Sequence, residues 1–213
     1  VLEGALHIYG AIKRLVEKYQ LNGLTIRCFD LLGKYKNTAC LALALLNEEG
    51  ITSACEGDVP SLLTMHMIYA LTGRPSFQAN PSTLDQINKK VMFAHCTLPL
   101  NMVSKYELLT HFESNLGIGI KGQMPLGEVS ICKLFIGPKG GLDTSISMTG
   151  TIKENLSLPG YCRTQIVVEL SEYDIINLLK EDFGNHCIIS YADVSDDFYS
   201  LLTFYDADKL LEK

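Results

Sequence analysis

The chain has 213 residues, of which 47% are hydrophobic and 20% are charged, and its formal net charge is -6. This composition is typical of a soluble globular protein with one large domain or two small ones. Basic residues form no cluster, so we expect no nucleic-acid partner. The longest apolar runs are too short to span a bilayer and no signal peptide is visible, so we expect no membrane partner.

The seven cysteines are odd in number and irregularly spaced, and no C-x-x-C pair occurs. Several of them lie within apolar, strand-like runs. This pattern is typical of buried free thiols in a reducing compartment, so we expect a cytoplasmic protein.

The chain begins at Val1 rather than Met, within a helical pattern that no capping segment precedes. This beginning predicts a fragment or processed product whose N-terminal region is missing. A scar left by cleavage of a tag is the alternative explanation.

Helical and strand-like patterns alternate in the first third of the chain. The predicted elements are a helix over 2–19, a strand over 24–29, a helix from 37 to 48, a strand over 51–55, a helix over 60–71 and a strand over 76–79. This alternation predicts a parallel, Rossmann-like α/β domain over residues 1–90, incomplete at its N-terminal side.

The pattern changes after residue 90, where strand-like runs follow one another through glycine-containing turns such as 137–141. We predict strands over 91–95, 106–113, 128–136, 144–152 and 163–170. The tail predicts helices over 172–182 and 196–211, separated by a strand over 186–191. Residues 91–213 are therefore expected to form a β-rich domain, an antiparallel sheet or small barrel with C-terminal helices.

Two carboxylates, Glu56 and Asp58, follow the strand over 51–55 and precede a helix that begins near Pro60. Open α/β sheets bind ligands at this edge. The alternative is that both carboxylates only cap the helix and offset its dipole.

Two histidines complete the candidate site. His95 ends one predicted strand and His186 begins another, and either one alone is more often a core or capping residue than a ligand. Carboxylates and imidazoles that converge from separate segments are suited to a divalent metal. The neighbouring Cys96 and Cys187 point to the opposite face from their histidines, so cysteine catalysis is not expected.

Four segments together resemble one enzyme family. They are Cys55-Glu56-Gly57-Asp58-Val59, Leu71-Thr72-Gly73-Arg74-Pro75-Ser76-Phe77, Phe93-Ala94-His95-Cys96, and Asn185-His186 followed by an apolar strand. In this order they resemble the L-fucose isomerase and L-arabinose isomerase superfamily, from about residue 20 to 205. The resemblance covers only the later part of such enzymes.

The resemblance implies an aldose–ketose isomerase that uses a divalent metal, usually Mn²⁺, through an enediol mechanism. It implies Rossmann-like domains followed by a barrel-like domain, and trimers or hexamers with a small sugar as substrate. By position, Glu56 matches the first acidic ligand and acid/base residue, His186 the C-terminal histidine ligand, and His95 an additional histidine of arabinose isomerases.

The second acidic ligand of the family falls at Asn80 in this chain. An amide oxygen can bind a metal, but it cannot accept a proton near neutral pH. Asp58, Asp85 or a water on the metal are candidate substitutes. Two further readings therefore stay open: a non-catalytic or regulatory sugar-binding relative of the same fold, and an unrelated protein whose carboxylates only cap helices.

Overall fold

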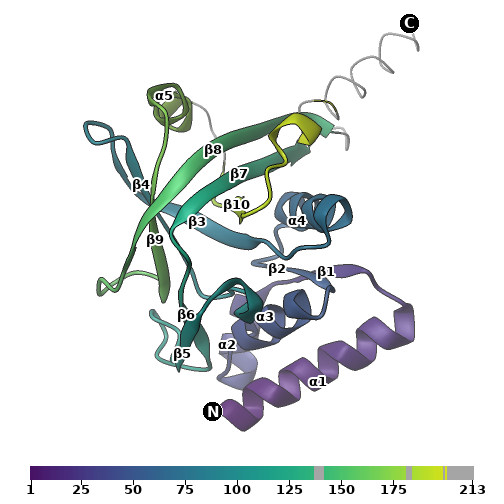
Figure 1. The fold of residues 1–213 in the computed structure, drawn as a ribbon. Coiled ribbons are helices and arrows are strands. Elements are labelled where there is room, and N and C mark those ends of the chain that lie inside the picture. The colour runs from purple at the N-terminus through teal and green to yellow at the C-terminus, as the bar shows by residue number, and fades with distance from the viewer. Residues whose placement is uncertain (137–141, 181–183, 199, 201–213) are drawn as a thin grey trace, which may run out of the picture.

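A computed structural model describes residues 1–136, 142–180, 184–198 and 200. Two parts follow each other along the chain (Figure 1). The N-terminal part packs helices around a small parallel sheet, and the second part is a closed antiparallel barrel. The protein is thus a mixed α/β structure in which most strands are antiparallel.

The N-terminal part holds a parallel sheet of only two strands, which pair from Gly23↔Thr52 to Ile26↔Cys55. Its elements in chain order are α1 (Leu2–Tyr19), β1 (Gly23–Ile26), α2 (Cys28–Tyr35), α3 (Cys40–Glu48), β2 (Thr52–Cys55) and α4 (Val59–Thr72).

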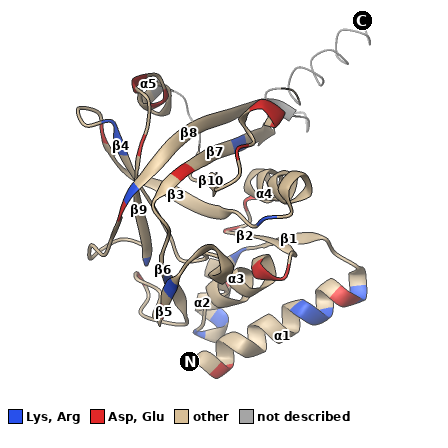
Figure 2. Ribbon diagram, in the orientation of Figure 1, with Lys and Arg blue, Asp and Glu red and all other residues tan. Residues whose placement is uncertain are grey.

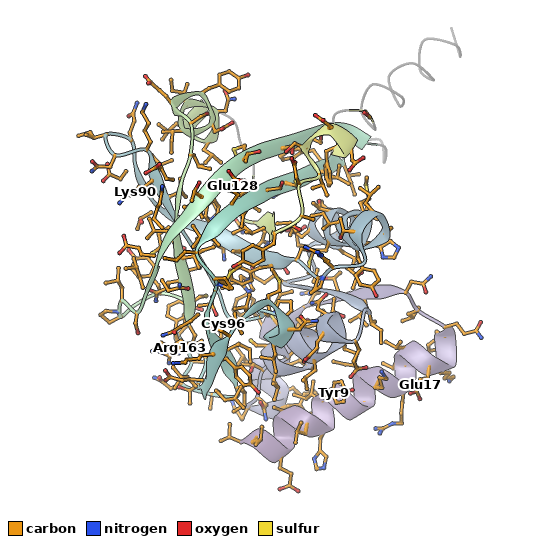
Figure 3. All side chains as sticks on the ribbon, viewed as in Figure 1. Tyr9, Glu17, Lys90, Cys96, Glu128 and Arg163 are labelled. Atoms are coloured by element: carbon orange, nitrogen blue, oxygen red, sulfur yellow. The ribbon has the colours of Figure 1, made fainter. Side chains whose placement is uncertain are left out.

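Helix α3 is the centre of this part because it is apolar on nearly every side. Leu41 and Ala44 join the core of the barrel, whereas Ala42 and Leu46 pack against α1. Tyr9 of α1, labelled in Figure 3, bonds to Glu49 just after α3, as does Lys13. These contacts fix α1 on the outer side of α3.

Six strands form the barrel in the order β10-β3-β4-β9-β8-β7, and every neighbouring pair is antiparallel. They are β3 (Phe77–Asp85), β4 (Lys90–His95), β7 (Gly127–Ile136), β8 (Leu142–Leu156), β9 (Thr164–Glu169) and β10 (Cys187–Ser190). Alternate side chains fill the interior, and the fully buried members include Phe77, Phe93, Ile131 and Ile166.

Smaller elements surround the barrel. A hairpin of β5 (Lys105–Leu109) and β6 (Gly119–Gln123) follows a single turn of 3₁₀ helix, Leu100–Met102, and α5 (Glu172–Lys180) precedes β10. Helix α4 covers the outside of β7 and β10, where Met65 and Ile68 pack on Leu134 and Ile188. The hydroxyl of Thr64 also accepts a hydrogen bond from the Leu134 N–H, 2.9 Å long.

The prediction of a third parallel strand over 76–79 is wrong. Strand β3 begins at Phe77, continues to Asp85 and pairs antiparallel with both β4 and β10. Local sequence does not separate the two outcomes, because the partner β10 lies more than a hundred residues further along the chain. The Rossmann-like part is therefore limited to β1, β2 and their helices.

Two elements of the structure were not predicted. Residues 28–35 form α2, and residues 119–123 form β6. The expected turn at 137–141 and most of the expected helix over 196–211 lie outside the described residues. The predicted strands over 128–136 and 163–170 match β7 and β9 within a residue.

Surface charge and cysteine chemistry agree with the composition. Figure 2 shows acidic and basic residues dispersed over both parts of the described chain. The seven cysteines are free, and six of them are buried. Within the described ranges, no helix is long and apolar enough to cross a membrane.

Candidate metal centre

The turn after β2 holds Glu56 in an unusual backbone conformation. Its φ is 63°, and Gly57 follows at 71°. The Gly57 N–H donates to the Ile26 carbonyl at 3.0 Å, and the Asp58 N–H donates to the Cys55 carbonyl at 3.2 Å. A left-handed residue other than glycine is uncommon, and such residues concentrate at functional sites.

Asp58 caps α4 and also contacts a distant histidine. One carboxylate oxygen accepts from the Ser61 N–H at 2.8 Å, and the other accepts from the Ser61 hydroxyl at 2.7 Å. The second oxygen also lies 2.8 Å from Nδ1 of His186. Asp58 therefore is a helix cap, as the structural alternative predicted, whereas Glu56 makes no capping bond.

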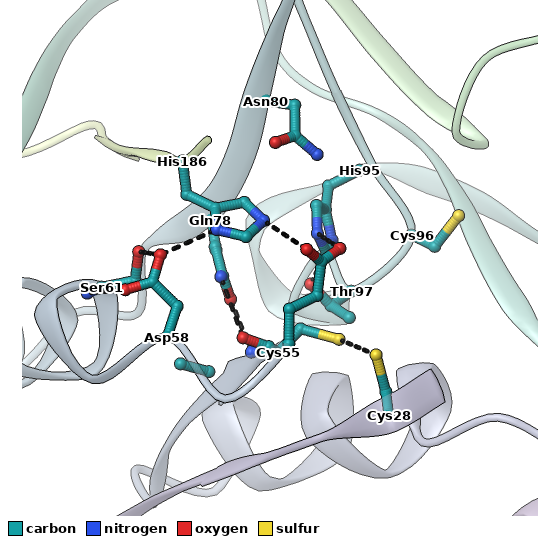
Figure 4. A network of polar contacts seen from close by, with 12 residues as sticks. Cys28, Cys55, Asp58, Ser61, Gln78, Asn80, His95, Cys96, Thr97 and His186 are labelled. Atoms are coloured by element: carbon teal, nitrogen blue, oxygen red, sulfur yellow. Dashed lines mark hydrogen bonds and ion pairs between the residues drawn. The ribbon is translucent and has the colours of Figure 1, made fainter. Parts of the chain in front are cut away.

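Glu56, His95 and His186 converge although they come from three separate segments (Figure 4). Glu56 Oε1 lies 3.6 Å from His95 Nε2, and Oε2 lies 3.5 Å from His186 Nε2. The two imidazole rings meet edge to face with their centroids 5.2 Å apart. Both histidines are at least 97% buried, whereas the Glu56 side chain is 26% exposed.

Both Nε2 atoms are buried and lack a hydrogen-bond partner among the described residues. Unpaired polar atoms at buried positions are rare and call for an explanation. One ligand atom from each of the three side chains lies within 4.8 Å of the others. A divalent ion bound at about 2.1 Å from nitrogen and oxygen draws its ligands to slightly shorter separations, so the three groups are compatible with such an ion.

Hydrogen bonds at the other ring nitrogens orient both imidazoles. Asp58 only accepts when ionised, so the Nδ1–H of His186 points to it and Nε2 of the neutral ring carries the lone pair. Nδ1 of His95 lies 2.9 Å from the hydroxyl of Thr97. Histidine ligands of metals have partners of this kind.

The electrostatics of the site keep its carboxylates ionised. Polar contacts with His186 and His95 hold the pKa of Glu56 far below its usual range. Burial raises the pKa of Asp58, but the hydrogen bonds from His186 and Ser61 outweigh it and lower the pKa to about 2. Burial lowers the pKa of His95. Burial also acts to lower the pKa of His186, but Asp58 and Glu56 raise it overall.

The raised pKa of His186 predicts that binding of a divalent ion releases a proton from this ring at pH values below that pKa. The raised pKa of His186 means that the ring binds a proton more tightly than a free histidine. Metal affinity should therefore rise with pH until the pH exceeds that pKa, and then become constant. Calorimetric titrations with Mn²⁺ in two buffers of different ionisation enthalpy, from pH 5.5 to 8.5, measure both quantities. An affinity that is flat over this range would contradict the assignment of His186.

Asn80 lies above the two imidazoles in Figure 4, with its amide directed toward them. Gln78 and Asn80 lie on the same face of β3. Phe77 and Ala79 point to the other face, into the barrel core. The Gln78 amide accepts from the Cys55 N–H at 2.7 Å and donates to the Cys55 carbonyl at 3.3 Å. Gln78 thus ties β3 to the end of β2, directly before Glu56.

Asp85 is placed away from this centre. It lies at the far end of β3, exposed, where its carboxylate accepts hydrogen bonds from Asn88 in the hairpin turn. Four residues of strand lie between it and Asn80, and each step along a strand is about 3.3 Å. The structure therefore brings Glu56, Asp58 and Asn80 together with the two histidines and leaves Asp85 outside.

A cavity of about 420 Å³ opens beside the centre. It is lined by Glu56, Asp58, Pro60, Lys133, Phe135, Ile136, Gly184, Asn185 and His186. Sequence reasoning singled out only part of this lining and missed Lys133. It also missed Gln78 and Thr97, which do not line the cavity but bond to Cys55 and His95. A polar residue at an otherwise apolar strand position is the signal that could have identified Lys133.

Comparison with known proteins finds relatives that are named as sugar isomerases. No family model matches the chain. It is 25% identical over 206 residues to a protein named sulfoquinovose isomerase from Clostridium sp. (strain MSTE9), covering 92% of this chain and 45% of that relative. Proteins of the same name from Alkalicoccus urumqiensis and Priestia megaterium are 25% and 22% identical, with 87% and 89% of this chain covered.

The chain spans less than half the length of these relatives, namely 45%, 43% and 44%. The fold and site define a candidate metalloprotein with a barrel-edge cavity. The similarity supports the coarser part of the resemblance, to sugar isomerases, and does not single out the fucose and arabinose type.

Proposed function

We propose that this chain is the C-terminal, site-bearing portion of a metal-dependent sugar isomerase that interconverts an aldose and a ketose. The observation that carries the proposal is the pair of buried, unpartnered Nε2 atoms that face one carboxylate. The names of the similar proteins support the reaction class. Conversion of sulfoquinovose to its ketose by the full-length protein, measured with and without added Mn²⁺ after chelation, tests it.

Glu56, His95 and His186 would hold the ion, with the amide oxygen of Asn80 as a further ligand. A bound divalent ion would stabilise negative charge that develops on the oxygens of the sugar. Carboxylate, amide and imidazole ligands suit Mn²⁺, which we propose as the metal. The fucose and arabinose isomerase type of site is part of the same proposal.

The reaction moves a proton between neighbouring carbons and needs groups that accept and return it. Glu56 is ionised and partly exposed, and it lines the cavity. We therefore assign it the role of taking the proton from one carbon and returning it to the next. Asp58 and Thr97 act through the histidines, since each holds one ring nitrogen and leaves the other facing Glu56.

Asn80 favours a second candidate, a sugar-binding relative of the same fold that does not turn its ligand over. Its amide faces the centre but accepts no proton. Asn80→Asp should then raise metal affinity by about tenfold or more, because it restores a charged ligand. The measurement is Mn²⁺ titration together with the isomerisation assay. Turnover in the unchanged protein rules out the second candidate, and turnover only in Asn80→Asp supports it.

We also propose that the full-length protein is a homo-oligomer, a trimer or hexamer. Leu2, Leu6 and Leu15 of α1 are each 45% or more exposed, and an apolar cavity of about 500 Å³ runs between α1 and α2. Light scattering should therefore give a mass above that of one chain. A sharp monomer at all concentrations would count against it.

A further inference from the structure

Lys133 is a charged residue at a position where the barrel otherwise places apolar ones. Val129 and Ile131 precede it on the same face of β7 and point into the barrel core. Lys133 continues this face and is only 5% exposed. The neighbouring Cys132 and Leu134 point outward to α4 instead.

Lys133 forms no ion pair with any described residue, although charged residues are almost never this buried without a partner. The Phe135 ring lies beside the ammonium, with its centroid 5.6 Å from Nζ. Glu56 and Asp58 line the same cavity, but Glu56 faces the two imidazoles and Asp58 bonds to His186, and neither forms an ion pair with the lysine. The ammonium is thus available for an anion that is not part of the described chain.

The cavity joins Lys133 to the candidate metal centre. The same 420 Å³ volume is lined by Glu56 and His186 and by Lys133. This volume is in the range of small-molecule sites. Gly184 keeps the space beside the lysine open, because a Cβ at this position would lie only 3.2 Å from Nζ. The φ of Gly184 is +65°, a conformation that favours glycine over residues with a side chain.

We infer that Lys133 binds an anionic group, a sulfonate or a phosphate ester, at the end of the sugar remote from the reacting carbons. This inference rests on the proposed function, which places the reacting carbons at Glu56 and the histidines. The similar proteins carry the name of a sulfonated sugar, which fits an ammonium better than a neutral hydroxymethyl group would. Lys133 is then a specificity-determining residue and takes no part in proton transfer.

The test is calorimetric binding of three sugars to the manganese-supplemented full-length protein: sulfoquinovose, its neutral counterpart 6-deoxyglucose, and glucose 6-phosphate. We expect an anionic sugar to bind about 10- to 100-fold more tightly than the neutral one, the range of a hydrogen bond to a charged group. Preference between sulfonate and phosphate identifies the anion.

Lys133→Met should abolish the advantage of the anionic sugar and leave the neutral sugar bound as before, whereas Lys133→Arg should retain part of it. Met keeps the length of the side chain and removes a buried charge, so this variant should fold, which melting curves check. Lys153→Met is the matched control, because Lys153 is exposed and paired with Glu169 on the barrel. It should change neither affinity.

Equal binding of charged and neutral sugars by the unchanged protein would overturn the inference, as would equal losses for both in Lys133→Met. The proposed function fails separately. If the protein prefers the anionic sugar through Lys133 but forms no ketose, the inference about anion binding stands and the proposed isomerase activity is wrong. If it binds charged and neutral sugars equally and forms ketose from both, the isomerase activity stands and the inference is wrong.

Discussion

Glu56→Gln is expected to lower the isomerisation rate of the full-length protein by roughly 100- to 10,000-fold, the range of a lost general acid–base group. Gln keeps the size of the side chain but neither accepts a proton nor carries the charge that faces both imidazoles. The measurement is ketose formation under saturating Mn²⁺, so that a weaker metal site does not by itself explain the loss.

Glu107→Gln is the matched control for this variant. Glu107 is a largely exposed carboxylate on β5 that pairs with Lys121, and its replacement should leave the rate unchanged. Glu56→Gln should also keep the fold, because its side chain makes no cap and belongs to no core cluster. Unchanged activity in a folded Glu56→Gln protein would remove Glu56 from the reaction.

His186→Ala is expected to cause the largest loss of Mn²⁺ affinity. It deletes one of the two unpartnered Nε2 atoms and leaves the Asp58 carboxylate without its distant partner. Asp58→Asn should have a smaller effect, within the roughly 10- to 100-fold that loss of an outer partner costs a metal site. Asn is as good a helix cap as Asp, so this variant should keep α4 intact.

His66→Ala is the control, since His66 lies on α4, away from the candidate centre, and its side chain hydrogen-bonds to Thr52. Calorimetry should rank the losses of affinity as His186→Ala, then Asp58→Asn, then His66→Ala with almost none. Melting curves in the absence of metal separate lost affinity from lost folding. Should Asp58→Asn weaken binding as much as His186→Ala, Asp58 itself would have to be a ligand.

Much of the secondary structure was predictable because its signals are local. Asp58 and Pro60 mark the start of α4, and Gly73 ends it in the left-handed conformation that glycine adopts readily. Strand β7 was recognisable from its apolar residues. Such features depend on a few neighbouring residues, so sequence reasoning found them within a residue or two.

The place of β3 was not predictable in the same way. Its first residues follow a helix and a glycine stop, as a third strand of a parallel sheet would. Pairing with β4 and with the distant β10 places it in the barrel instead. The choice between two sheets depends on which surfaces are buried together, and no local pattern contains this information.

By itself, the sequence determined which residues stand at the ends of elements: Glu56 after β2, His95 at the end of β4 and His186 before β10. Only the tertiary structure decided that the pairing of β4 and β10 with β3, and the docking of the end of β2 against β3, bring these three ends together, with two imidazole nitrogens buried against one carboxylate. It alone also turned Lys133 toward the same cavity. The physical reason is that distances between side chains from separate segments are set by strand pairing and packing, which involve the whole chain.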